Sequence, residues 1–120
     1  MELPKIYPIT DVSITKLSHL EQVKQLIHGG AKLIQLREKN NSPKEFYEAA
    51  KVVMDFVRNT DVKIIINDRV DIALAVKADG VHLGQDDLPP VYARDILGKN
   101  AIVGFSTHSV DQAVEALRFA

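Results

Sequence analysis

Polar side chains alternate with apolar ones in the stretch LIQLREKN, residues 33–40. Gln35, Arg37 and Lys39 stand at every second position of this stretch. Because successive side chains of a strand point to opposite faces, these three would share one face, and the apolar residues between them would pack on helices. Arginine offers a planar fork and lysine a point charge to phosphate oxygens. The pattern fits an anion pocket, and it fits about equally a strand that ends before two solvated cations.

Acidic and amide side chains follow two later apolar runs. Asn67 and Asp68 come directly after three isoleucines, and Gln85, Asp86 and Asp87 follow the run that begins at Gly80. One acid of each group could simply cap the next helix. Carboxylates near anion-binding cations also suit Mg²⁺, which takes one or two carboxylates together with phosphate oxygens. In that interpretation Asp68 and Asp87 are the natural ligands.

Histidine and hydroxyl side chains complete the set of candidates. Ser106 and Thr107 follow an apolar run and are free to donate to a ligand, while the Ser-x-His spacing to His108 is weak evidence for nucleophilic catalysis. His82 lies inside an apolar run, a position typical of a hydrogen-bonded core histidine. None of these signals is specific when it stands alone.

The elements that must hold these residues are short strands alternating with amphipathic helices. Apolar runs predict strands at residues 5–10, 32–37, 63–67, 80–83 and 101–105. Helical periodicity predicts helices at residues 17–27, 43–56, 70–77, 91–97 and from 110 onward. Ser18, Ser42 and Ser109 each precede an acid or amide by three residues, which is the pattern of a capping box.

Five successive β-α units imply a parallel sheet with right-handed crossovers, but two architectures remain open. One is an open, doubly wound sheet. The other is part of an eight-stranded barrel, which normally needs about 250 residues. In both, ligands bind at the carboxyl ends of the strands, where all the candidates lie. The 120 residues are expected to form a single domain, 1–120.

The net charge, the lack of cysteine and the lack of long apolar runs exclude several classes of function. The formal net charge is −1, from 15 basic and 16 acidic residues, so no electrostatic surface for nucleic acid or an anionic membrane is expected. The absence of cysteine excludes disulfides and thiolate metal sites. The first residues lack the pattern of a signal peptide and no apolar run is long enough to span a membrane, so a cytoplasmic location is expected.

Four ordered motifs together resemble the thiamine phosphate synthase family. They are QLREK from Gln35, INDRVDIA from Ile66, DGVHLGQDDLP from Asp79 and GFSTHS from Gly104. The resemblance implies a TIM (β/α)8 barrel of which this chain holds the N-terminal portion, about five β-α units. It implies a transferase of thiamine biosynthesis that joins hydroxymethylpyrimidine diphosphate to thiazole phosphate and releases diphosphate, with Mg²⁺ as cofactor.

The same resemblance implies roles for individual residues. Asp68 and Asp87 would hold Mg²⁺, and no residue would act as a nucleophile. The residues that would bind the substrates are Gln35, Arg37, Lys39, Asn67, His82, Gln85 and Ser106. Asp86 and His108 receive no role.

Two alternatives stay open at this level. A related thiazole tautomerase resembles the chain around Ser106 and His108 but lacks the metal-binding acids, which are present here. The second alternative is that the chain is a non-catalytic module that binds a ligand or assembles with another chain. An incomplete barrel leaves strand edges open, so a homo-oligomer or completion by a second chain is expected.

Overall fold

Five parallel strands lie side by side in the order in which they occur along the sequence. The structure is a computed structural model that describes residues 2–119. Within these residues the sheet order is β1-β2-β3-β4-β5. The strands are β1 (Ile9–Thr10), β2 (Leu33–Leu36), β3 (Lys63–Asn67), β4 (Gly80–Leu83) and β5 (Ile102–Phe105).

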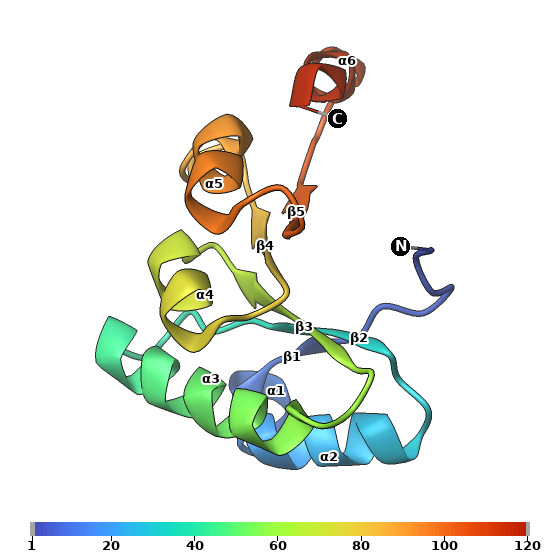
Figure 1. Cartoon of the computed structure of the whole chain (residues 1–120), viewed down its shortest axis with the longest axis vertical. Coiled ribbons are helices and arrows are strands. Elements are labelled where there is room, and N and C mark those ends of the chain that lie inside the picture. The colour runs from blue at the N-terminus through green and yellow to red at the C-terminus, as the bar shows by residue number, and fades with distance from the viewer. Residues whose placement is uncertain (1, 120) are drawn as a thin grey trace.

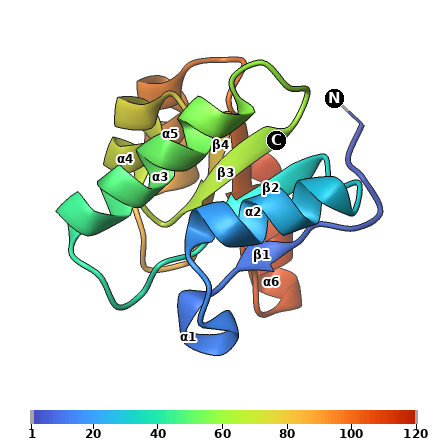
Figure 2. The same cartoon turned by 90° about the horizontal axis from the view of Figure 1, so that it is seen from below.

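This strand order decides between the two architectures. A doubly wound sheet reverses its order at a switch point and carries helices on both faces. Here each strand pairs with the next in the chain, as in a TIM barrel. Figure 1 shows the strands along an arc with α2 to α5 on its outer side, and Figure 2 shows α2 and α3 across the same side of β1 to β3. The expected TIM-barrel type of fold is confirmed, with five of its β-α units.

Four of the six α-helices in residues 2–119 begin at a side-chain cap, and α4 and α5 do not. The helices are α1 (Val12–Thr15), α2 (His19–His28), α3 (Pro43–Val57), α4 (Val70–Val76), α5 (Pro90–Leu97) and α6 (Val110–Ala116), followed by the 3-10 helix η1 (Leu117–Phe119). Ser18 and Glu21 form a complete capping box, and the Ser42 and Ser109 hydroxyls accept from the backbone N–H three residues on. Among residues 2–119, no helix combines the length and the apolar character needed to cross a bilayer.

The apolar core lies between the sheet and its outer helices. Ile34, Leu36, Ile64 and Ile66 point into it from β2 and β3, and all are fully buried. Helix residues such as Val53 cover them from the other side. Burying each of these large side chains stabilises the fold by roughly 1.5–3 kcal/mol. This leaves the alternate residues of the strands, including Gln35 and Asn67, on the other face of the sheet.

Two features at the N-terminus differ from the prediction. The predicted strand 5–10 is reduced to Ile9–Thr10. Pro4 and Pro8 have no N–H to donate to a neighbouring strand, although the Pro8 carbonyl accepts from the Gln35 N–H at 3.0 Å. The helix α1 was not predicted, because four residues are too few to show helical periodicity. It forms where the Asp11 carboxylate accepts from the N–H groups of Ser13 and Ile14.

Candidate active site

The carboxyl ends of β2, β3 and β4 bring a cation and two acids together. Lys39, in the loop after β2, forms an ion pair with Asp68 Oδ2 in the loop after β3. Asp87, which follows β4, lies near enough to Asp68 for that acid to raise the pKa of the Asp87 carboxyl. Three residues distant in the sequence therefore lie at the same edge of the sheet, where both candidate architectures place ligands.

Asp68 does not cap the following helix. The N-cap position of α4 is Arg69, and no side chain caps that helix end. The backbone of Asp68 has φ = 65°, in the left-handed region that Asp and Asn tolerate better than most residues. Its N–H donates to the His82 carbonyl at 2.8 Å, which ties the end of β3 to β4. The alternative of a helix cap at Asp68 is therefore wrong, and its carboxylate is directed to Lys39.

Asp87 closes a turn and also leaves its helix uncapped. Its Oδ2 accepts from the Gly84 N–H at 2.7 Å, while the N-cap position of α5 is Pro89 without a side-chain cap. Burial is the largest cause that raises the pKa of the Asp87 carboxyl, and the neighbouring Asp68 raises it further against the lowering effect of the Gly84 N–H. A cation bound between these two carboxyl groups would offset the repulsion between their negative charges. Asp86, on the same turn, is exposed.

Gln35 and Asn67 form a buried pair of amides, and Gln35 also reaches the exposed Tyr7. The Asn67 Nδ2 donates to Gln35 Oε1 at 2.8 Å, and the Gln35 Nε2 donates to the Tyr7 hydroxyl at 3.1 Å. Gln35 is only 2% exposed, so its amide is fixed rather than solvated. Asn67 Oδ1 is the one buried side-chain polar atom in residues 2–119 without a hydrogen-bond partner. An unpaired buried acceptor is costly, and a donor or cation supplied by a ligand would satisfy it.

His82 and Ser106 meet across β4 and the end of β5. His82 Nε2 lies 2.7 Å from Ser106 Oγ, and Gln85 Nε2 donates to the Ser106 carbonyl at 2.8 Å. Gly104 faces the His82 ring, and a Cβ at that position would overlap Nδ1. Burial is the main cause that lowers the pKa of His82, although the charges of Asp68 and Asp87 oppose it. The imidazole is thus favoured in its neutral form.

Arg37 stands apart from the other predicted site residues in its contacts. Its Nη1 lies 3.3 Å from Asp11 Oδ2, and the guanidinium is about two-fifths exposed. Asp11 was not singled out as a site residue, nor was Tyr7. Both belong to the segment YPITD, and their place on either side of the first strand, next to β2, is the signal that could have found them. The structure therefore links Lys39 to the acids and leaves Arg37 at the side of β1.

The oxygen atoms at this edge of the sheet suit the expected Mg²⁺. No cluster of three or more His, Cys, Asp or Glu side chains able to hold a metal occurs in residues 2–119. Mg²⁺ does not require one, because it is usually held by one or two carboxylates plus substrate phosphates and water. Asp68 and Asp87 supply two hard oxygen donors of this kind, and the unpartnered Asn67 oxygen lies on the preceding residue. The residues fit the ion.

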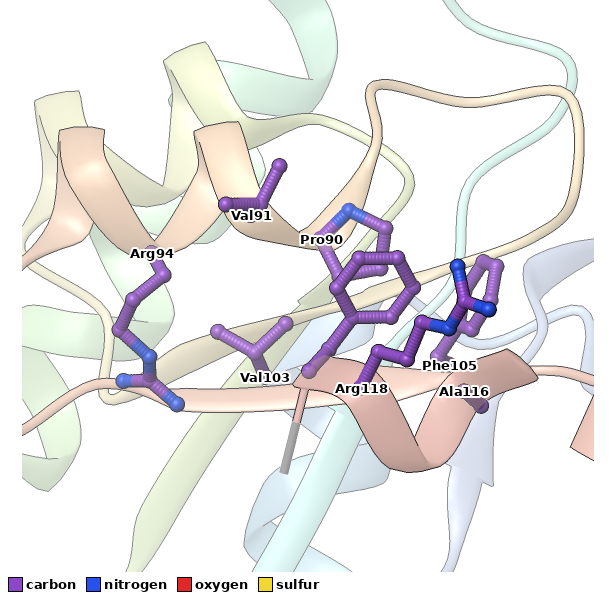
Figure 3. Close-up of a pocket in the computed structure, with 8 residues that line it drawn as sticks. Pro90, Val91, Arg94, Val103, Phe105, Ala116 and Arg118 are labelled. Atoms are coloured by element: carbon purple, nitrogen blue, oxygen red, sulfur yellow. The ribbon is translucent and has the colours of Figure 1, made fainter. Parts of the chain in front are cut away.

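A separate hollow lies on the helix side of β5. Its volume is about 300 Å³, and residues of α5, β5 and the C-terminal helices line it. Figure 3 shows the Pro90 and Phe105 rings and Val103 around this hollow, with Arg94 and Arg118 at its two ends. None of the predicted site residues lines it. A second pocket of about 340 Å³ is the one that includes Gln85 and Asp87.

A parallel sheet in sequential order, with ionic and amide side chains at the carboxyl ends of its strands, defines a protein of the β/α-barrel class. A family model described as thiamine monophosphate synthase matches residues 6–119. The chain belongs to this family.

Similar proteins support the same assignment. A thiamine-phosphate synthase of Clostridium acetobutylicum is 46% identical over 115 residues, covering 95% of this chain and 54% of that protein. One from Caldanaerobacter subterraneus is 51% identical over 112 residues, covering 92% and 52%. The solved structure of a thiamine phosphate pyrophosphorylase from Pyrococcus furiosus matches with a TM-score of 0.84 and 40% identity, covering 95% and 55%. The chain spans about half the length of the curated relatives it matches.

Proposed function

We propose that this chain carries the pyrimidine diphosphate and magnesium site of a thiamine phosphate synthase. The reaction would join hydroxymethylpyrimidine diphosphate to thiazole phosphate and release diphosphate. The observation that supports this most is the ion pair of Lys39 with Asp68, with Asp87 close by, at the carboxyl ends of three neighbouring strands. It joins an anion-binding cation to two metal-binding acids in a member of the synthase family.

Each side chain has a defined task in this proposal. Asp68 and Asp87 would hold Mg²⁺, which, when bound, would help to neutralise the charge that builds on the departing diphosphate. Lys39 and Arg37 would bind phosphate oxygens as a point charge and a fork. The fixed amides of Gln35 and Asn67, together with Gln85, would orient the substrate. The hydrogen bond from Asn67 to Gln35, and that from Gln85 to the Ser106 carbonyl, hold these amides in place before a ligand arrives.

Ser106 would orient the pyrimidine and would not act as a nucleophile. A reactive serine needs a base that is itself held by a third group. His82 Nε2 is close to the Ser106 hydroxyl, but no hydrogen bond to His82 Nδ1 is found among residues 2–119. The electron-rich aminopyrimidine can stabilise a cationic methylene, so departure of diphosphate before attack by the thiazole nitrogen requires no protein nucleophile.

The test is formation of thiamine phosphate from both substrates with Mg²⁺, combined with binding of the pyrimidine diphosphate alone. Mg²⁺-dependent binding is expected, and Asp68→Ala should abolish its dependence on the metal. Asp95→Ala, an exposed acid on α5, is the matched control. Binding without product would favour the non-catalytic module. Neither binding nor product from a folded sample would reject the proposed site.

The expected homo-oligomer, or completion by a second chain, is part of this proposal. Large apolar side chains of the C-terminal helices support it, since Val110, Val114 and Leu117 are 79%, 59% and 71% exposed. The molecular mass in solution, measured by light scattering, tests it, and a strict monomer would reject association. A cytoplasmic location likewise stays a prediction.

A further inference from the structure

A chain of three polar side chains runs behind the loop that carries Arg37 and Lys39. His19 Nδ1 lies 2.7 Å from the Thr10 hydroxyl, and His19 Nε2 lies 2.9 Å from Glu38 Oε1. Thr10 comes from β1, His19 from the first turn of α2, and Glu38 from the loop after β2. The side chains of His19 and Glu38 are only 3% and 5% exposed. A histidine and a carboxylate are seldom buried unless they are paired, and both are fully engaged here.

The Glu38 carboxylate accepts hydrogen bonds from the loop residues that follow it. Besides His19, its carboxylate accepts from the Asn40 N–H at 3.1 Å and from Asn41 Nδ2 at 3.2 Å. Burial acts to raise the pKa of Glu38, but the hydrogen bonds from His19 and the loop outweigh it and leave the pKa below its ordinary value. The ionised carboxylate is therefore the form that binds the loop.

The contacts hold the chain on both sides of Glu38. On one side the Arg37 N–H donates to the Thr10 hydroxyl at 3.4 Å. On the other side Lys39 is followed by Asn40, whose N–H is bound by Glu38. The side chains of Arg37 and Lys39 pair with Asp11 and Asp68 and form no hydrogen bond or ion pair with Glu38. The network thus holds the backbone of both cations without binding their charged groups itself.

We propose that Thr10, His19 and Glu38 are positioning residues that hold Arg37 and Lys39 in the geometry of the anion site. His19 is the essential link, because it joins the helix layer to the loop. The role of the two cations rests on the proposed function. The ordering of residues 37–41 by His19 and Glu38 is independent of that function and can be measured without a ligand.

Two substitutions of His19 separate the two halves of the network. Asparagine places its amide near the position of Nδ1 and can keep the Thr10 contact but not the contact with Glu38. Glutamine reaches the position of Nε2 and can donate to Glu38. Glu38→Gln supplies an independent variant that removes the charge and keeps the shape. The controls are His28→Asn, at the exposed end of α2, and Glu48→Gln, on the exposed face of α3.

The first measurement is amide hydrogen exchange of residues 37–41 in the unliganded chain. His19→Asn and Glu38→Gln should speed exchange of this segment at least tenfold, while His19→Gln and both controls stay within threefold of the original chain. Unchanged exchange in the first two variants overturns the inference. Equal acceleration in His19→Asn and His19→Gln does so too, because it would mean that the histidine only fills space.

The second measurement is calorimetric binding of inorganic diphosphate with Mg²⁺. His19→Asn and Glu38→Gln should raise the dissociation constant at least tenfold, and His19→Gln less than threefold. Faster loop exchange with unchanged affinity would overturn the positioning of the cations. Failure of the original chain itself to bind diphosphate would reject the proposed function, and the exchange comparison would still decide whether His19 and Glu38 order the loop.

Discussion

The ammonium group of Lys39 pairs with the carboxylate of Asp68 that we propose as a magnesium ligand. A side-chain cation thus lies against a carboxylate that, in our proposal, holds the metal ion. The pair is partly exposed, with Lys39 43% exposed, so it can open at little cost. If Asp68 holds Mg²⁺ as proposed, Lys39 and the metal would compete for the same carboxylate, and a diphosphate could bind both cations.

Lys39→Met should therefore have opposite effects on two ligands. Affinity for Mg²⁺ alone should rise about threefold to tenfold, because the competing charge is gone, and affinity for diphosphate with Mg²⁺ should fall about tenfold. Titration calorimetry measures both. Lys44→Met, an exposed lysine in the first turn of α3, should change neither. A loss of Mg²⁺ affinity in Lys39→Met would contradict the assignment of Asp68.

Asp87→Asn should stabilise the metal-free chain while removing its response to Mg²⁺. The asparagine oxygen can still accept from the Gly84 N–H, and repulsion from Asp68 disappears. We expect the free energy of unfolding in urea to rise by about 0.5 kcal/mol, and the added stability in Mg²⁺ and diphosphate to vanish. Asp86→Asn is the control and should keep the response. A ligand effect that survived in Asp87→Asn would exclude this residue as a ligand.

Gly104→Ala should displace the His82 ring. The added Cβ would overlap His82 Nδ1, so the ring or β5 must move, at a cost of about 1–3 kcal/mol. Thermal unfolding measures the loss. The loss of the His82–Ser106 hydrogen bond should appear as a shift of the His82 ring resonances. Gly29→Ala, whose Cβ would make ordinary contacts at 3.5 and 3.6 Å, should be tolerated. Equal stability of the two variants would show that the ring has room to move.

The stabilising effect of Glu38 should depend on pH in a defined direction. Its pKa in the folded chain is below the ordinary value of 4.5, so the unfolded chain binds more protons between the two pKa values. The contribution is complete above pH 4.5 and is lost as the pH falls through the folded pKa. Glu38→Gln should thus cost about 1.5 kcal/mol near neutral pH and much less in acid. Urea unfolding between about pH 3 and 7 measures this, with Glu48→Gln as control.

Most of the fold could be predicted because its signals are local. Isoleucine-rich runs marked β3, and the serine caps marked the starts of α2, α3 and α6. Strand order could not be predicted from periodicity, because a barrel and a doubly wound sheet share the same alternation of strands and helices. The two architectures differ in which strands pair with each other, and strand pairing joins residues that are distant in the sequence.

The grouping of the candidate residues at one edge of the sheet was predictable from the sequence, and their individual contacts were less so. The ends of parallel strands meet at one edge, so Lys39, Asp68 and Asp87 could be grouped from the sequence. The role of His19 could not be found, because its position at the start of an amphipathic helix looks like any other. Its partners Thr10 and Glu38 lie 9 and 19 residues away in the sequence, and only the packing of α2 beneath β1 and the following loop joins them.

The left-handed backbone at Asp68 restricts which residues evolution can place there. Aspartate combines a carboxylate with better tolerance of that conformation than most residues have. If Asp68 holds the metal as proposed, a lineage that abandoned the metal would be expected to drift to asparagine or glycine at this position, keeping the turn. A lineage that retained the metal would be expected to keep aspartate.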